Sequence, residues 1–230
     1  MKKQDLHPNL AITGYRNDRY NEHDPVRGDN AENMRKKIAL NTGLVYLFTG
    51  DGKGKTSAAL GMLLRALSHG WKVGWVSWYK QASWGISEHQ FPAILKKSVL
   101  DRLQFVAKGQ GFFLGKDNKK VVQAGNAVIV DGVSEEEHKK AGMDALKEAQ
   151  QLLPVVDVLF LDEICNAIAD KLILEEDVVL LLAKRKKTHI VLTGRKASQQ
   201  LMQVADLVSE VKKIKHPFDV GIMAVKGLDF

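Results

Sequence analysis

Cysteine is almost absent from this chain: Cys165 is the one cysteine among its 230 residues. A disulfide framework within the chain is therefore excluded, and a reducing cytoplasm is the compartment that this composition favours. Apolar runs are short, and none approaches the roughly 20 residues that a helix needs to span a bilayer. The basic start Met1–Asp5 is not followed by an apolar stretch, so we expect no secretory signal. We thus expect a cytoplasmic protein that does not enter the membrane.

Positive charge is in moderate excess, since 34 Lys and Arg stand against 27 Asp and Glu and give a net charge of +7. This excess favours anionic partners, and nucleotides and nucleic acids satisfy it equally well. The chain also lacks the residue spacing of a zinc site and a Ser/His/Asp nucleophile signature. Its length and its 45% of hydrophobic residues are sufficient for one α/β domain with a sizeable core.

The most informative segment is Thr49–Ser57, which reads Thr-Gly-Asp-Gly-Lys-Gly-Lys-Thr-Ser. It follows the apolar run Leu44–Phe48 and precedes a helical pattern, and this context is typical of a phosphate-binding loop. Its three glycines allow backbone N–H groups to surround an anion at a helix N-terminus. Lys55 can neutralise phosphate oxygens, and the Thr56 hydroxyl can bind Mg²⁺. The strict pattern begins with glycine, whereas this loop begins with a threonine.

Alternating strand and helix patterns follow the loop and predict an α/β fold, with a P-loop NTPase-like parallel sheet of about six strands and helices on both faces. Helices are predicted from near Ala58 to His69-Gly70, over Ser134–Leu153 with a capping box of Ser134 and Glu137, and over Glu175–Lys184 and Ser198–Val204. Strands are predicted at Leu44–Phe48, Val73–Tyr79, Leu103–Val106, Val155–Leu161, His189–Thr193, Leu207–Val211 and Asp219–Val225, with Ala127–Val130 in a small hairpin.

Candidate site residues fall at the predicted strand ends, where parallel sheets bind ligands. Asp162 ends an apolar strand and can support Mg²⁺, and Glu163 can lie near the metal or orient water. A pair of acids that stabilises a helix N-terminus is the alternative for both. Lys80 and Arg195 can hold phosphate oxygens, although a solvated surface charge is an alternative for each.

The remaining conspicuous side chains favour structural roles. Trp75 is predicted in the core, while Trp78 and Trp84 either pack in the core or flank a planar ligand. Cys165 is interpreted as a small buried hydrophobe. The basic run 184–187 either touches nucleic acid or stabilises a helix C-terminus, and the second interpretation is favoured.

Together these motifs resemble the phosphate-loop type of corrinoid adenosyltransferase, also known as the ATP:cob(I)alamin family, from about Leu44 to Phe230. The resemblance includes the threonine that begins the loop. It rests further on Arg65-Ala66, His69-Gly70, Trp84, Glu88, Gly109-x-Gly-Phe112, Leu161-Asp162-Glu163, Thr193-Gly194-Arg195, Ala205–Glu210, Lys215-His216 and Lys226-Gly227. It implies that reduced corrinoid, as Co(I), attacks the 5′ carbon of ATP and that inorganic triphosphate leaves. The physiological corrinoid stays open between cobalamin, cobinamide and an incomplete corrin ring.

The resemblance also assigns residues. Lys55, Glu163 and Phe112 are the expected catalytic residues, and Phe112 would lie against the corrin and help to remove the lower ligand of Co(II). Leu114 stands where the family often has tryptophan, and only Lys80 is retained from the family's Gln-Phe-x-Lys. Mg²⁺ is expected at Thr56, Asp162 and Glu163. The expected ATP and corrinoid contacts are Gly50, Asp51, Gly52, Lys53, Gly54, Lys55, Thr56, Ser57, Lys80, Arg195 and Leu114.

Two further expectations concern organisation and partners. Residues 1–43 form a polar arm with a short helix around Ala31–Leu40, either an active-site cap or a mobile tail, and residues 44–230 form the nucleotide- and corrinoid-binding domain. By the same resemblance we expect a homodimer and a flavoprotein reductant, with nucleic acid not expected as a partner. Two alternatives stay open at this point: an ATPase of the same class, stimulated by nucleic acid, and a non-catalytic corrinoid- or nucleotide-binding protein.

Overall fold

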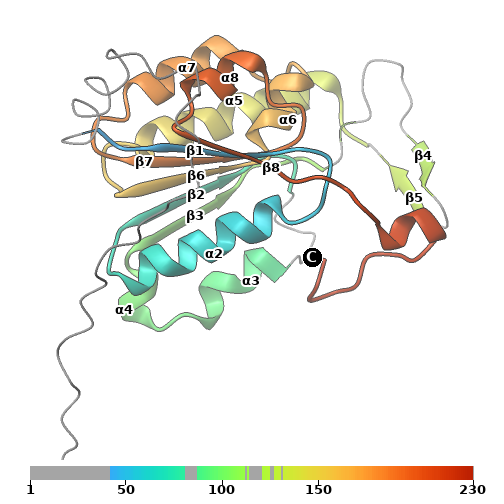
Figure 1. Ribbon diagram of the computed structural model, residues 1–230, viewed down its shortest axis with the longest axis horizontal. Coiled ribbons are helices and arrows are strands. Elements are labelled where there is room, and N and C mark those ends of the chain that lie inside the picture. The colour runs from blue at the N-terminus through green and yellow to red at the C-terminus, as the bar shows by residue number, and fades with distance from the viewer. Residues whose placement is uncertain are drawn as a thin grey trace, which may run out of the picture. The chain divides into compact units, whose positions relative to one another are not determined.

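A six-stranded parallel sheet in the order β3-β2-β6-β7-β1-β8 forms the centre of the fold (Figure 1). The computed structural model describes residues 42–80, 87–111, 113, 121–124, 127–130 and 132–229. The six strands are β1 (Val45–Thr49), β2 (Val73–Ser77), β3 (Leu103–Ala107), β6 (Val158–Asp162), β7 (His189–Thr193) and β8 (Leu207–Glu210). The prediction of an α/β fold built on a parallel sheet is confirmed.

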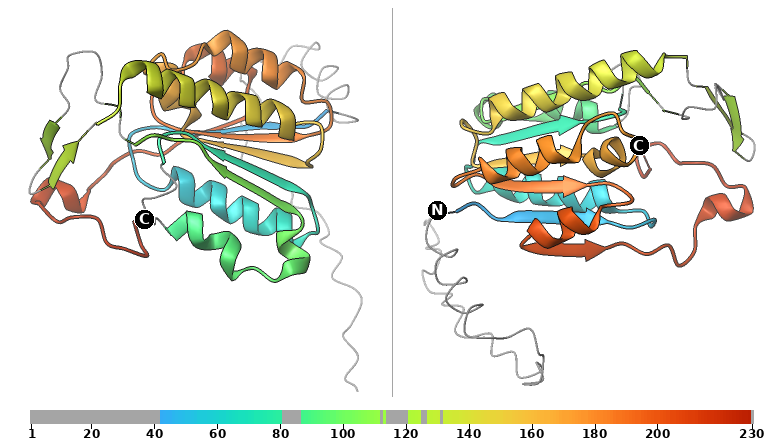
Figure 2. Two further views of the ribbon diagram at one scale, coloured as in Figure 1. Left: turned by 180° about the vertical axis from the view of Figure 1, so that it is seen from behind. Right: turned by 90° about the horizontal axis from the view of Figure 1, so that it is seen from above.

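Helices cover both faces of this sheet (Figures 1 and 2). One face carries α2 (Lys55–Ser68), α3 (Ser87–Ile94) and α4 (Lys97–Leu100). The opposite face carries α5 (Glu135–Leu152), α6 (Ile164–Ala169), α7 (Glu175–Ala183) and α8 (Gln199–Val204). A separate antiparallel hairpin consists of β4 (Val121–Ala124) and β5 (Ala127–Val130), which confirms the hairpin predicted around Ala127–Val130.

The sheet separates two apolar clusters because successive side chains of a strand point to opposite faces. Trp75 and Phe160 pack with Leu63 of α2 in one cluster. Their strand neighbours Val76 and Leu161 pack in the other, which also contains side chains of α5, α6 and α7. Strands buried on both faces are mostly apolar along their length, which explains the continuous apolar run that precedes Asp162 in β6.

Several local predictions are confirmed residue by residue. Ser134 caps α5, its side chain accepting the Glu137 N–H at 3.2 Å while the Glu137 carboxylate accepts the Ser134 N–H at 2.9 Å. His69 and Gly70 end α2, and Gly70 has the positive φ of 92° that suits a glycine after a helix. Arg185 of the basic run donates to the Leu182 carbonyl at the end of α7, as expected for a helix C-terminus.

Two stretches were wrongly predicted. Asp219–Val225 is not a strand: the structure has a 3-10 helix at Pro217–Val220, which starts on a proline and ends at Gly221 with φ 78°. Helices α3 and α4 were missed, because Pro92 interrupts the helical signal of α3 and α4 is only four residues long. The short helix predicted around Ala31–Leu40 lies outside the described residues, as does Trp84.

The capping box gives a testable expectation for the fold. Replacing Ser134 with alanine removes the acceptor for the Glu137 N–H, so the free energy of unfolding should fall by about 1 kcal/mol. Chemical denaturation monitored by circular dichroism measures this loss. Ser68→Ala, at the exposed last residue of α2, is the matched control and should change it by less than about 0.5 kcal/mol. Equal stability of the two variants would contradict a stabilising cap.

Candidate functional site

The loop 50–54 connects β1 to α2 and wraps around the Lys55 side chain. The Lys55 ammonium donates to the carbonyls of Gly50 at 2.8 Å and of Gly52 at 2.6 Å. Burial lowers the pKa of Lys55, and the neighbouring Arg195 lowers it further. Gly54 begins α2 with φ 119°, a conformation that glycine adopts at little cost. A buried cation next to a helix N-terminus is the chemistry of an anion site.

The C-terminal segment supports the outer side of this loop. The Gly52 N–H donates to the Val211 carbonyl at 2.7 Å, and a Cβ on Gly52 would lie 2.7 Å from Lys212 backbone, so only glycine fits. The Asp51 carboxylate accepts the Lys213 N–H at 3.2 Å, which lowers the pKa of Asp51. Lys53 forms an ion pair with Asp229. The side chains of Asp51 and Lys53 therefore both have partners in the C-terminal segment.

Thr49, which replaces the first glycine of the usual loop pattern, is 5% exposed at the end of β1. Its hydroxyl oxygen accepts the Ala197 N–H at 3.3 Å. This contact ties the start of the loop to the connection between β7 and α8. The threonine thus has a structural function that glycine could not perform, because glycine has no side-chain acceptor.

Asp162 is the buried centre of the site. It lies at the end of β6 with no exposed surface, and one carboxylate oxygen accepts the hydroxyls of Thr56 at 2.9 Å and Thr193 at 2.8 Å. The other oxygen accepts the Lys80 ammonium at 2.7 Å. These three donors come from α2, from the end of β7 and from the segment after β2. A buried carboxylate requires such compensation, and here the compensation joins three separate parts of the chain.

Lys80 also donates to Glu88 of α3 at 3.0 Å. Burial alone would lower the pKa of Lys80, but the carboxylates of Asp162 and Glu88 outweigh it and raise the pKa to about 12. Lys80 is therefore a permanently charged member of the site. The alternative of a solvated surface charge is wrong for this residue, whose side chain is 16% exposed.

Glu163 follows in the left-handed region, with φ 65°, and its N–H donates to Thr193 at 2.9 Å. Burial and the charge of Asp162 raise the pKa of Glu163, while Lys80, Lys55 and Arg195 oppose them. The neighbouring Cys165 is buried, and its pKa is raised to about 12, so it is the inert hydrophobe expected from the sequence.

Arg195 is held near Glu163 by a hydrogen bond of its backbone. The Arg195 N–H donates to the Asn166 side chain at 2.5 Å, and the Arg195 side chain is exposed. Ser57 lies exposed in the first turn of α2.

Phe112 and Leu114, the two residues expected to contact the corrin, lie outside the described residues. Their neighbour Phe113 packs edge-on against His138 of α5, with ring centroids 5.2 Å apart.

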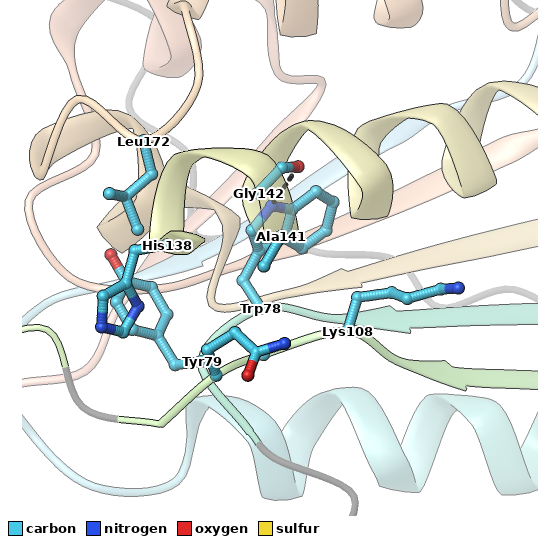
Figure 3. A pocket seen from close by; sticks show the side chains of 9 residues that line it. Trp78, Tyr79, Lys108, His138, Ala141, Gly142 and Leu172 are labelled. Atoms are coloured by element: carbon cyan, nitrogen blue, oxygen red, sulfur yellow. Dashed lines mark hydrogen bonds between the residues drawn. The ribbon is translucent and has the colours of Figure 1, made fainter. Parts of the chain in front are cut away.

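A small pocket lies beside the end of β2, between the segment 108–110 and α5 (Figure 3). Trp78 forms part of its lining and donates its indole N–H to the Gly142 carbonyl at 3.1 Å. Because Trp78 is only 2% exposed, the core interpretation of this residue is confirmed, as it is for Trp75.

No group of three or more His, Cys, Asp or Glu that could hold a metal ion occurs among the described residues. None of the helices in that part of the chain is long and apolar enough to cross a membrane.

Comparison with known proteins identifies the family. A family model described as ATP:corrinoid adenosyltransferase BtuR/CobO/CobP matches residues 41–230. The chain belongs to this adenosyltransferase family. It is 31% identical over 193 residues to the corrinoid adenosyltransferase CobA of Salmonella typhimurium, covering 82% of this chain and 86% of that protein. Corrinoid adenosyltransferases of a Sinorhizobium species and of Pseudomonas aeruginosa are each 34% identical, covering 82% of this chain and 80% and 84% of those proteins.

A solved structure of a DNA replication initiation factor is also similar, with 12% identity and a TM-score of 0.37 over 86% of this chain and 51% of that chain. A likeness this distant carries no argument. For an adenosyltransferase, the informative result is that the structure brings Thr56, Asp162 and Lys80 into one set of contacts, next to the loop that surrounds Lys55. Sequence reasoning missed Glu88 and Thr193 as members of it. In the sequence, Glu88 is one of the residues shared with the adenosyltransferase family, and Thr193 is the last residue of a predicted strand, but neither observation indicates a contact with Lys80 or Asp162.

The Asp162–Lys80 pair predicts a stability effect. Lys80→Met keeps the aliphatic stem but leaves a buried carboxylate without its cation, so the free energy of unfolding should fall by about 3 kcal/mol. Denaturant titration measures the loss. Lys139→Met removes the exposed pair with Glu135 and should cost less than about 1 kcal/mol. If the Lys80 variant lost no more than the Lys139 variant, the structural importance assigned to the buried pair would be wrong.

Proposed function

We propose that this chain transfers the 5′-deoxyadenosyl group of ATP to the Co(I) centre of a reduced corrinoid and releases triphosphate. Co(I) supplies the electron pair of the new cobalt–carbon bond. The bond between the 5′ carbon and its oxygen breaks, and its electrons leave with the triphosphate. Membership of the adenosyltransferase family supports the reaction. The observation that carries it in the structure is the buried Lys55 ammonium inside a glycine-rich loop at a helix N-terminus.

The loop suits a polyphosphate leaving group. The Lys55 ammonium donates to two neutral carbonyl oxygens. Triphosphate would offer this ammonium phosphate oxygens instead, which are stronger acceptors because they carry negative charge. Stabilisation of charge that develops in the transition state is the usual source of the largest catalytic effect. Triphosphate would replace these two carbonyl acceptors of Lys55 with phosphate oxygens, inside a loop whose outer side is supported by the C-terminal segment.

Magnesium fits the oxygen donors of this site. Mg²⁺ binds through one or two protein oxygens together with phosphates and waters, and therefore needs no dedicated group of carboxylates. Thr56 would bind it through its hydroxyl oxygen, because the hydroxyl proton is donated to Asp162. Both Asp162 oxygens already accept hydrogen bonds, which favours an indirect function for Asp162, with Glu163 as the nearby carboxylate. When bound, the ion would neutralise charge on the triphosphate.

The other nucleotide and corrin contacts remain proposals. Lys80 and Arg195 provide cationic groups at the ends of β2 and β7, and the charge of both acts on Glu163. By the family resemblance, Phe112 lies against the corrin and aids removal of its lower ligand. Leu114 provides an apolar side chain where the family often has an aromatic one.

A homodimer, a flavoprotein reductant, a cap formed by residues 1–43 and a cytoplasmic location complete the proposal. The homodimer is supported by large apolar side chains that are exposed in the C-terminal segment, since such patches mark interaction sites. These side chains are Ile214, Phe218, Val220, Ile222, Met223, Val225 and Leu228.

The test is a product analysis under anaerobic conditions. Chemically reduced cobalamin and Mg·ATP are supplied, and the light-sensitive spectrum of the alkylcobalt product is followed while released triphosphate is assayed. We expect one triphosphate for each adenosylated corrinoid. Formation of ADP and orthophosphate without an organocobalt product would instead identify an ATPase.

Lys55→Ala should lower the turnover of this reaction about a hundredfold or more, because the loss of one preorganised donor costs about 3 kcal/mol of transition-state stabilisation. Single-turnover formation of the alkylcobalt product measures the rate. Lys72→Ala, an exposed lysine just before β2 at the opposite end of the strands, is the control and should react at the wild-type rate. Near-normal turnover of the Lys55 variant would contradict the proposed task of the loop.

A further inference from the structure

The segments that leave β2 and β3 stay bonded to each other beyond the sheet. The Lys108 N–H donates to the Ser77 carbonyl at 3.2 Å, and the Gly111 N–H donates to the Tyr79 carbonyl at 2.9 Å. Between them, a Cβ on Gly109 would lie 2.0 Å from the carbonyl carbon of Tyr79, so a larger residue cannot be accommodated. The segment 108–111 and the turn at Tyr79 are therefore one packed unit.

Tyr79 adopts an unfavourable backbone conformation within this unit. Its φ is 61°, and the Lys80 N–H donates to the Trp78 carbonyl at 2.7 Å, which closes a three-residue turn. A left-handed tyrosine persists only when its surroundings hold it, and such positions cluster at functional sites. Here the phenol O–H donates to the Asp170 carboxylate at 2.7 Å. Burial and this hydrogen bond raise the pKa of Tyr79, so the phenol stays a donor.

The bond from Tyr79 to Asp170 closes a ring of contacts. Asp170 directly follows α6, and Glu163 directly precedes the same helix. From Asp162 the ring runs through α6 to Asp170, then through the hydrogen bond to Tyr79, and returns through Lys80 to Asp162. The position of the Lys80 ammonium is therefore fixed from both ends of α6.

The same turn faces two sites. On one side it sets Lys80 against Asp162, whose other oxygen accepts the hydroxyl of Thr56 next to the nucleotide loop. On the other side its carbonyl binds Gly111, just before the position proposed to contact the corrin. A small pocket lined by Tyr79 and Gln110 lies between this unit and α5 (Figure 3).

We propose that Tyr79, anchored by Asp170, is a positioning residue that couples nucleotide binding to corrinoid binding. The inference rests on the proposed function, because it requires both ligands to bind this chain. A nucleotide bound at the loop would contact the start of α2, where Thr56 bonds Asp162, and Asp162 bonds Lys80 at the turn that holds the segment 108–111. Coupling between two ligands is reciprocal, so each ligand should raise the affinity for the other by the same factor.

The experiment measures that factor with cob(II)alamin, which lacks the Co(I) nucleophile and therefore binds without turnover. Its dissociation constant is determined by absorbance titration with and without Mg·ATP. We expect Mg·ATP to tighten binding to the wild-type protein about fivefold or more, and we expect the factor to fall towards one in Tyr79→Phe. Tyr46→Phe, on β1 and away from this turn, is the matched control and should keep the wild-type factor.

Variants of Asp170 separate positioning from general stability. Asp170→Asn keeps an oxygen acceptor for the phenol and should retain most of the coupling, whereas Asp170→Ala should lose it as Tyr79→Phe does. The double variant should lose no more than either single one, because both remove the same bond. Undiminished coupling in Tyr79→Phe and Asp170→Ala, or a wild-type factor of one, would overturn the inference. Wild-type protein that forms no adenosylated corrinoid would instead overturn the proposed function.

Discussion

The buried carboxylate of Asp162 is the interaction on which the site depends. It has no exposed surface and accepts hydrogen bonds from Thr56, Thr193 and Lys80. An uncompensated charge at this depth would be strongly unfavourable, so its donors are held in place together. They lie on α2, β7 and the segment after β2, and the carboxylate therefore fixes the start of the nucleotide-loop helix relative to two other strand ends. The start of the nucleotide-loop helix and the cationic Lys80 are both positioned by this one constraint.

Two further sets of contacts extend from that centre. The C-terminal segment supports the nucleotide loop through Gly52 and Asp51, in addition to the bond between Thr56 and Asp162 at the start of α2. On the opposite side, Lys80 continues into the left-handed turn at Tyr79, which binds the segment after β3. The nucleotide loop, the oxygens proposed to bind Mg²⁺ and the proposed corrin segment are thus parts of one connected framework. This connection suits a reaction in which two ligands must meet with their reacting atoms aligned.

Local signals made much of the fold predictable. The capping box at Ser134, the glycine-rich loop and the apolar strand before Asp162 are encoded within a few residues each, and all appear in the structure. The failure after Pro217 has a cause outside the segment, since its apolar residues resemble a strand but pair with none of the strands in the described part of the chain. The ion pair of Lys80 could not be derived, because it depends on the order of β2 and β6 in the sheet. The anchoring of Tyr79 by Asp170 spans 91 positions and had no sequence signal.

The most direct test of the central claim, that the loop holds the departing triphosphate, is a crystal structure of the complex with Mg·ATP. The account predicts the triphosphate along the loop 50–55 with the ribose 5′ carbon directed towards the ends of β6 and β2, where Lys80 and the segment 108–111 lie. An ATP molecule with its γ-phosphate at the ends of β6 and β2, and its ribose directed away from these strand ends, would contradict the account, because the cobalt nucleophile could not reach the 5′ carbon.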